Sequence, residues 1–163
     1  MKLLKCSVIL AISAVSFAAC VNGSLLRRRR SERCSAEGDN ALDKKILVVD
    51  DSATVRQQVR AALADTGFEI VEAADGIEGL DAIAARQDLA AVVCDVNMPR
   101  LGGLQLLETL SAQGKVPGLP VVMLTTEGQP ALMQRAKAAG ARGWLVKPFK
   151  PATLVATLRK LTA

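Results

Sequence analysis

Three aspartates, a threonine and a lysine are the residues of this 163-residue chain whose types and spacing could carry chemistry. Asp50 and Asp51 follow one short apolar run and Asp95 follows another, while Thr125 and Lys147 come after two more. Three carboxylates at one site repel one another and attract a hard cation such as Mg²⁺, which prefers oxygen ligands. A carboxylate can attack phosphorus to form an acyl phosphate, while an ammonium group and a hydroxyl stabilise the phosphoryl oxygens. The residue types therefore indicate a phosphoryl acceptor site that uses Mg²⁺, provided that the fold brings them together.

The composition excludes several other kinds of site. The chain has no histidine, which rules out Ser-His-Asp and Cys-His nucleophiles, histidine-ligated zinc and a phosphohistidine on this chain. Aromatic residues make up 2% of the chain, too few for an aromatic-lined cofactor pocket. The four cysteines have no C-x-x-C pair or metal-ligand spacing, and Cys94 lies in an apolar run, so we expect it to be an inert buried thiol.

The net charge of +5 is concentrated in the first quarter of the chain. Residues 1–40 hold seven Lys or Arg and three Asp or Glu, a net charge of +4, whereas residues 41–163 hold fourteen and thirteen, a net charge of +1. The body is thus nearly neutral, and we expect it to have no nucleic-acid partner.

Residues 1–40 form a leader with three interpretations. A basic start, an apolar run and small residues before Cys20 are typical of a secretory signal or a lipoprotein cleavage box. Alternatively, residues 6–26 carry no charge and are long enough to anchor the chain in the inner membrane, with the arginines at 27–30 keeping the body inside the cell. In the third interpretation the leader is not part of the working protein. We expect the body to be cytoplasmic, with a tether through residues 6–26 as an alternative.

From Lys44 onward, strand patterns and helix patterns alternate. Continuous apolar runs typical of buried strands occur at 46–49, 89–94, 121–124 and 144–146, and we expect a further strand at 68–71, where Glu69 interrupts the apolar residues. Helical stripes lie between and after them. Asp75 and Glu78 have the spacing of a capping box, Gly102-Gly103 is expected to open a helix, and Gly67 and Gly140 are expected to end helices. Five βα units predict an α/β protein with the flavodoxin-like (βα)5 three-layer sandwich, a five-stranded parallel sheet of strand order 2-1-3-4-5.

The predicted topology would bring the five candidate residues to one edge of the sheet. Ligands of such sheets bind outside the carboxyl ends of the strands, and each candidate follows its strand at that end. Any one of them alone has an ordinary explanation, since an Asp or Thr after a strand is often a helix cap and a Lys is usually on the surface. Their joint placement favours a common site.

The body resembles the receiver domain of two-component response regulators, most of all the single-domain chemotaxis type. The resemblance covers residues 44–163, which with the preceding linker we assign as a receiver domain at 41–163. Asp51 and Asp95 are 44 residues apart. Thr125 follows Asp95 by 30 residues and Lys147 follows Thr125 by 22, and these separations suit this family. The matching segments are Ile46–Ser52, Cys94–Pro99, Leu124–Thr125 and Val146–Phe149.

The resemblance implies a role for each site residue. Asp95 would be the phosphoacceptor, and Lys147 would pair with its phosphoryl group and precede a cis peptide bond to Pro148. Asp51 and Asp95 would bind Mg²⁺ through their side chains. Asn97 would do so through its backbone carbonyl, and Asp50 through water.

The resemblance also implies which residues would transmit the signal. Thr125 would move toward the phosphoryl group, and Trp144 stands where the family has a rotating aromatic, usually Tyr or Phe. Thr126 replaces a smaller residue, often Ala, and would narrow the path to the phosphoacceptor. Asn97 and Glu127 occupy two positions that tune dephosphorylation, and this pair resembles that of quickly reset members.

The predicted function is a phosphorylation switch. A sensor histidine kinase, a phosphotransfer protein or a small acyl phosphate would phosphorylate Asp95, and the face at about 129–161 would then bind an output protein. We expect no DNA-binding output domain, and no enzymatic activity beyond the domain's own phosphoryl transfer and dephosphorylation. One alternative is a Mg²⁺-dependent phosphohydrolase with an aspartate nucleophile, although that class needs a second acid where this chain has Asn97. A flavin-binding protein of the flavodoxin type and a binding module independent of phosphorylation are further alternatives.

Overall fold

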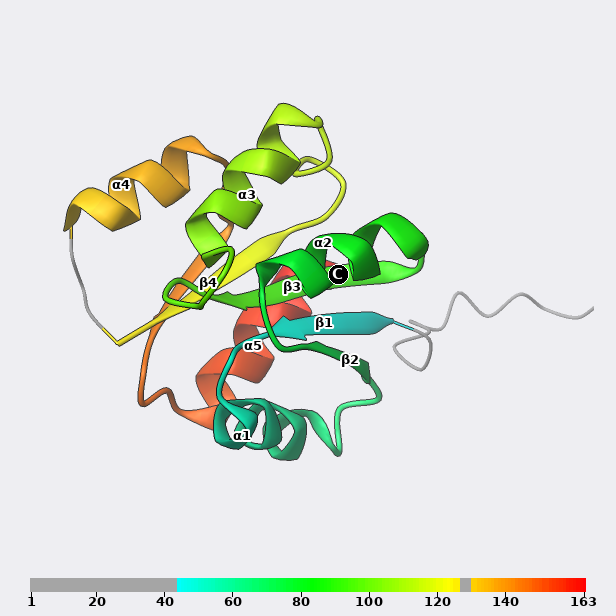
Figure 1. Cartoon of the computed structure of the whole chain (residues 1–163). Coiled ribbons are helices and arrows are strands. Elements are labelled where there is room, and N and C mark those ends of the chain that lie inside the picture. The colour runs from blue at the N-terminus through cyan, green and yellow to red at the C-terminus, as the bar shows by residue number, and fades with distance from the viewer. Residues whose placement is uncertain (1–43, 127–129) are drawn as a thin grey trace, which may run out of the picture. The chain divides into compact units, whose positions relative to one another are not determined.

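The computed structural model describes residues 44–126 and 130–163, in which strands and helices alternate along the chain (Figure 1). The strands are β1 (Lys45–Val49), β2 (Glu69–Ala73), β3 (Leu89–Asp95), β4 (Val121–Thr125) and β5 (Gly143–Val146). The helices are α1 (Ala53–Leu63), α2 (Gly76–Ala85), α3 (Gly103–Ala112), α4 (Pro130–Ala138) and α5 (Pro151–Thr162). The leader and Glu127 lie outside the described residues.

The strands form one parallel sheet of order β2-β1-β3-β4-β5, which confirms the predicted flavodoxin-like topology. The chain pairs β1 with β2, crosses to β3 on the other side of β1, and then continues outward to β4 and β5. Since β1 and β3 are neighbours, the segments that follow them lie beside each other at the carboxyl edge. This strand reversal is where ligands bind in such sheets.

Alternating side chains of the strands build a core on each face of the sheet. In β1, Ile46 and Val48 belong to one apolar cluster while Leu47 and Val49 belong to the other, and all four are fully buried. Helices α1 and α5 cover the first face, and α2, α3 and α4 cover the second (Figure 1). The continuous apolar runs in the sequence follow from this burial on both faces.

Helix boundaries follow the predicted signals in two cases and depart from them in a third. Gly140 adopts φ 97° just after α4, and Ala141 N donates to Ala136 O at 2.9 Å, the backbone pattern of a glycine helix stop. Asp75 caps α2 as predicted. Helix α1, however, ends at Leu63, and Gly67, the predicted stop, lies beyond a further turn with φ 82°.

No helix within residues 44–126 and 130–163 is both long enough and apolar enough to cross a membrane. The segment 6–26, proposed above as a tether, falls outside that part of the chain.

Candidate functional site

The carboxyl edge of the sheet gathers the candidate side chains from four strands. Asp50 directly follows β1, Asp95 is the last residue of β3, and Thr125 is the last residue of β4. Lys147 directly follows β5, where its backbone N–H donates to Thr125 O at 2.6 Å. Because these four strands are parallel and adjacent, their ends meet at one place, as the sequence predicts.

Three carboxylates lie together at this edge. Asp50, Asp51 and Asp95 each offer an oxygen within 4.8 Å of the others, close enough for one cation to contact all three. Asp50 is fully buried and Asp95 is 5% exposed, whereas Asp51 is exposed to solvent. An all-oxygen donor set with an open side fits Mg²⁺, which keeps several waters and takes few protein ligands.

Lys147 supplies the positive charge that the carboxylates need. Its Nζ donates to Asp50 Oδ2 at 2.6 Å and lies 3.0 Å from Asp95 Oδ1. The lysine side chain is 13% exposed, so both contacts are shielded from solvent. The bond between Lys147 and Pro148 is cis, in agreement with the prediction.

Burial and these contacts shift the pKa values of the pair. Burial raises the pKa of Asp95, and Asp50 adds to the rise, while the hydrogen bond and charge of Lys147 act against it. Burial would lower the pKa of Lys147, but its hydrogen bonds to Asp50 and Asp95 and their charges outweigh burial and raise it. A second cation beside Asp95 would favour its ionised form and lower the pKa of that carboxyl.

The backbone around the first aspartate is fixed by several hydrogen bonds. Asp50 Oδ1 accepts from Ser52 N at 2.9 Å, and the backbone N of Asp50 donates to Ala73 O at 3.2 Å. Arg56, on α1, donates from Nη1 to Asp50 O at 2.7 Å. The sequence does not single out Arg56, because an arginine on the polar side of a predicted helix is common.

A second residue whose role the sequence does not reveal, Gly103, lies against the backbone of Asp95. At Gly103, the first residue of α3, an added Cβ would collide with Asp95 O and approach Cys94 Sγ to 2.7 Å. Glycine at 103 therefore lets the start of α3 pack directly against the end of β3. The pair Gly102-Gly103 was interpreted only as a helix start, which it also is. Cys94 is a free, fully buried thiol whose pKa is raised by burial, as expected of an inert cysteine.

The remaining candidates lie at the end of β4, on β5 and in the loop after β3. Thr125 is fully buried, and Thr126 is exposed beside it. Asn97 is exposed in the loop between β3 and α3. Trp144, on β5, packs against the core cluster on the α3 and α4 side of the sheet. Its indole Nε1 is the one buried side-chain polar atom in residues 44–126 and 130–163 that has no hydrogen-bond partner.

Comparison with known proteins gives one consistent family. The model of the response regulator receiver domain matches residues 46–159. A chemotaxis protein CheY homolog of Campylobacter jejuni is 38% identical over 111 residues, 68% of this chain and 85% of the relative. Chemotaxis protein CheY1 of Helicobacter pylori is also 38% identical, covering 68% of this chain and 90% of the relative. The crystal structure of chemotaxis protein CheY4 of Vibrio cholerae is 42% identical with a TM-score of 0.67, covering 72% of this chain and 98% of that one.

The fold, the acidic edge of the sheet and these matches define a receiver domain of two-component signalling. The chain belongs to the response regulator receiver family, and within it to the CheY-like type. Receiver domains of this type are signalling switches, interact with histidine kinases and downstream targets, and generally bind Mg²⁺ at an acidic pocket.

Proposed function

We propose that this protein is a phosphorylation switch in which Asp95 accepts a phosphoryl group from a partner histidine kinase, a phosphotransfer protein or a small acyl phosphate. The contact of Lys147 with both Asp95 and Asp50 is the observation that best supports this function. It brings a cation to the oxygen on which phosphate would be placed, inside a cluster of carboxylates that fits a divalent metal.

Transfer of the phosphoryl group to Asp95 needs no reactant other than the phosphodonor. A carboxylate oxygen of Asp95 attacks phosphorus, and a new O–P bond forms while the P–N bond of a phosphohistidine or the P–O bond of an acyl phosphate breaks. The leaving imidazole or carboxylate keeps the electron pair of the broken bond. The Lys147 ammonium stabilises the phosphoryl oxygens, and the Thr125 hydroxyl donates a hydrogen bond to one of them. Water later hydrolyses the acyl phosphate and restores the aspartate.

Mg²⁺ would be held by the side chains of Asp51 and Asp95, by the backbone carbonyl of Asn97, and by Asp50 through water. When bound, it supplies charge neutralisation for the transferred phosphoryl group. Asn97 and Glu127 tune the rate of hydrolysis, and we propose a short-lived phosphorylated state. A phosphohydrolase with an aspartate nucleophile is less well supported, because that class needs a second acid two residues after the nucleophile and this chain has Asn97 there.

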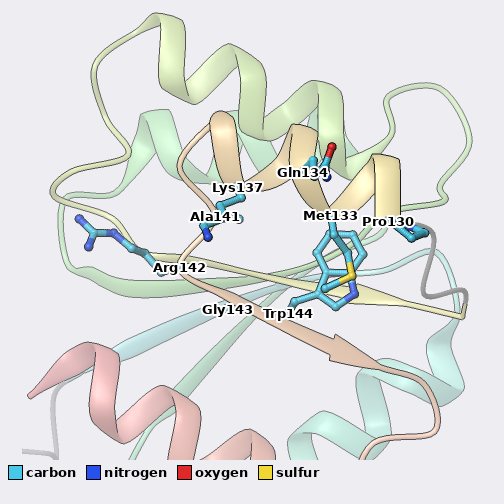
Figure 2. Close-up of a pocket in the computed structure, with 8 residues that line it drawn as sticks. All are labelled: Pro130, Met133, Gln134, Lys137, Ala141, Arg142, Gly143 and Trp144. Atoms are coloured by element: carbon cyan, nitrogen blue, oxygen red, sulfur yellow. The ribbon is translucent and has the colours of Figure 1, made fainter.

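Phosphorylation would be read out on the face formed by α4, β5 and α5. The phosphoryl group adds about −1.5 to −2 of charge at Asp95, and Thr125 and Trp144 carry the change to this face. A pocket of about 480 Å³ lies here. Its lining residues include Met133 of α4 and Trp144 of β5 (Figure 2). Met133 is 40% exposed and Val146 is 49% exposed, so the face also presents apolar surface.

The charge of this face indicates the chemistry of its partner. Apart from Lys147, which pairs with Asp50 and Asp95, residues 130–163 contain six Lys or Arg and no Asp or Glu. Lys137 and Arg142 lie at the pocket (Figure 2). Charge complementarity then favours an output protein that docks through an acidic segment with an apolar anchor.

We further propose that residues 41–163 act in the cytoplasm, where such kinases and acyl phosphates occur, and that residues 1–40 are separate from the receiver domain.

Acetyl phosphate labelling tests the proposed function. The full chain should incorporate phosphate when Mg²⁺ is present, and Asp95→Asn should abolish the incorporation. Asp88→Asn is the matched control, because Asp88 is an exposed aspartate at the other end of β3, where it pairs with Lys45 at 2.8 Å. Undiminished labelling of Asp95→Asn would refute the assignment, as would equal loss in both variants.

A further inference from the structure

The loop between β3 and α3 contains an unusual backbone conformation. Arg100 adopts φ 63°, and among residues 44–126 and 130–163 no other non-glycine residue has a positive φ. A side chain with a Cβ disfavours this left-handed region, so surrounding contacts must hold the residue there. Arg100 lies five residues after Asp95, in the segment that also contains Asn97.

Two carboxylates of α2 hold the Arg100 guanidinium. Arg100 Nη2 forms an ion pair with Asp75 Oδ2 and lies 3.4 Å from Glu78 Oε1. The Asp75 side chain is 3% exposed, and its other oxygen accepts from Ile77 N at 2.8 Å and Glu78 N at 3.0 Å. The second oxygen of Glu78 accepts from Ala74 N at 2.9 Å. The two side chains that close the first turn of α2 therefore each use their remaining oxygen to contact Arg100.

The neighbouring backbone makes a second contact with the same turn. Gly76 N donates to Leu101 O at 3.2 Å, and a Cβ at position 76 would collide with that carbonyl oxygen. The loop is thus attached to the start of α2 at two consecutive residues. At the other end of the loop, Gly103 N donates to Val96 O at 3.1 Å. Asn97 lies in the loop between Val96 and Arg100. The position of its backbone therefore depends on the Val96–Gly103 hydrogen bond and on the contacts of the loop with α2.

We propose that Arg100 is a positioning residue for the divalent cation. Its ion pair with Asp75 fixes the loop so that the Asn97 carbonyl is held ready to bind the metal. This inference rests on the proposed function, because it assigns a metal ligand to Asn97. It adds a residue on the loop, and a partner on α2, to the set that determines metal affinity.

The sign of the effect separates positioning from simple electrostatics. Removing the positive charge of Arg100 near an acidic site would by itself strengthen cation binding. Loss of positioning would weaken it. For Asp75→Asn, which retains the cap acceptor but loses the ion pair, both effects weaken binding. Arg100→Ala is therefore the informative variant, and Asp75→Asn tests whether the two residues act as a unit.

The experiment is a Mg²⁺ titration of the full chain by calorimetry, with urea unfolding of each variant as a check of folding. Arg100→Ala should weaken Mg²⁺ binding by about tenfold, the lower end of the effect of outer-shell residues on metal affinity. Asp75→Asn should weaken it similarly, and the double variant should be no weaker than the single ones. Arg135→Ala is the control, because it removes an exposed arginine that pairs with Glu108 at 2.8 Å and makes no contact with Asp75 or Glu78, and it should leave affinity within about twofold.

Each outcome decides the proposal. Unchanged or tighter Mg²⁺ binding by a folded Arg100→Ala overturns the role of Arg100 while leaving the proposed function intact. If that variant does not fold, Arg100→Gly takes its place with the same two outcomes, because it also lacks the guanidinium and glycine tolerates the positive φ of this position. Unchanged affinity in Asp75→Asn would likewise overturn the role of the ion pair. A wild-type chain that binds no Mg²⁺ refutes the proposed function together with this inference.

Discussion

Lys147 and Asp50 lie 97 positions apart in the sequence and form an ion pair, with 2.6 Å between Nζ and Oδ2. The same ammonium group lies 3.0 Å from Asp95 Oδ1, so one side chain contacts two buried carboxylates and leaves part of their negative charge uncompensated. Mg²⁺ would use the oxygens of the same cluster. The lysine and the metal are therefore expected to compete for the carboxylates before phosphate arrives, and to share the phosphoryl oxygens afterwards.

Replacing the lysine tests this competition. Lys147→Met should lower the stability of the metal-free protein by about 2 kcal/mol at neutral pH, because the two carboxylates lose their partner. The same change should strengthen Mg²⁺ binding, because the metal no longer displaces an ammonium group. Urea unfolding in a chelator and in Mg²⁺ measures both effects. Lys160→Met, an exposed change on α5, is the control, and an equal loss of stability with and without Mg²⁺ would contradict the competition.

The pH dependence of this effect follows from the raised pKa of Lys147. A lysine whose pKa is raised in the folded state contributes stability that is present below the unfolded value of 10.5 and is lost as the pH rises through the folded value. The stability difference between wild type and Lys147→Met should thus stay constant through neutral pH and shrink only above about 10.5. A difference that shrinks near neutral pH would contradict the raised pKa.

Asp95 should destabilise the metal-free protein. Its pKa is raised chiefly by burial and further by Asp50, so the ionised form costs free energy in the folded state. Asp95→Asn should therefore increase the free energy of unfolding by roughly 1 kcal/mol at neutral pH in a chelator. The gain should disappear as the pH falls from the raised pKa to below the ordinary aspartate value, where the wild-type residue is protonated in both states. Chemical unfolding across this pH range measures it, and a destabilised Asp95→Asn would count against the pKa direction.

Trp144 should report the state of the switch. It is the single tryptophan of the chain, and its buried Nε1 has no hydrogen-bond partner in the described part of the protein. Any rotation that gives Nε1 a partner or water should shift the fluorescence emission to longer wavelength. Acetyl phosphate with Mg²⁺ should produce this shift in wild type and not in Asp95→Asn. An emission spectrum that stays the same on phosphorylation would make Trp144 a fixed core residue.

Thr126 should limit entry of the phosphodonor. It is exposed directly after β4 and carries a larger side chain than the alanine that the resemblance to receiver domains leads us to expect there. Thr126→Ala should speed labelling by acetyl phosphate by about two- to fivefold, a change of less than ~1 kcal/mol in the barrier. Thr153→Ala, which changes an exposed threonine of α5, provides the control. An unchanged labelling rate would show that Thr126 does not limit access of the phosphodonor to Asp95.

Much of the fold could be predicted because burial on both faces leaves a direct mark on the sequence. The continuous apolar runs at β1, β3 and β4 located the strands, and the strand reversal placed Asp50 and Asp95 side by side. The pattern could not give side-chain contacts. Glu78 was predicted to complete a capping box at Asp75, but it accepts from Ala74 N, one residue earlier. The left-handed backbone of Arg100 depends on tertiary contacts, and no local sequence pattern predicted it.

The end of α1 was predicted incorrectly for a related reason. Gly67 is the nearest glycine after the apolar stripe, and a glycine commonly marks a helix end. In the structure, Thr66 N instead donates to Leu63 O at 3.1 Å, in a turn that separates the helix from Gly67. The roles assigned to Glu127 and to residues 1–40 remain predictions, because these residues lie outside the described part of the chain.

The most direct test of the central claim is to locate the phosphoryl group after the wild-type chain reacts with acetyl phosphate and Mg²⁺. Intact mass followed by peptide mapping, with the acyl phosphate trapped by reduction, identifies the modified residue. The account predicts one added phosphoryl group, carried by the peptide at Asp95, and none when Mg²⁺ is chelated. Modification at another residue, or equal modification without the metal, would contradict it.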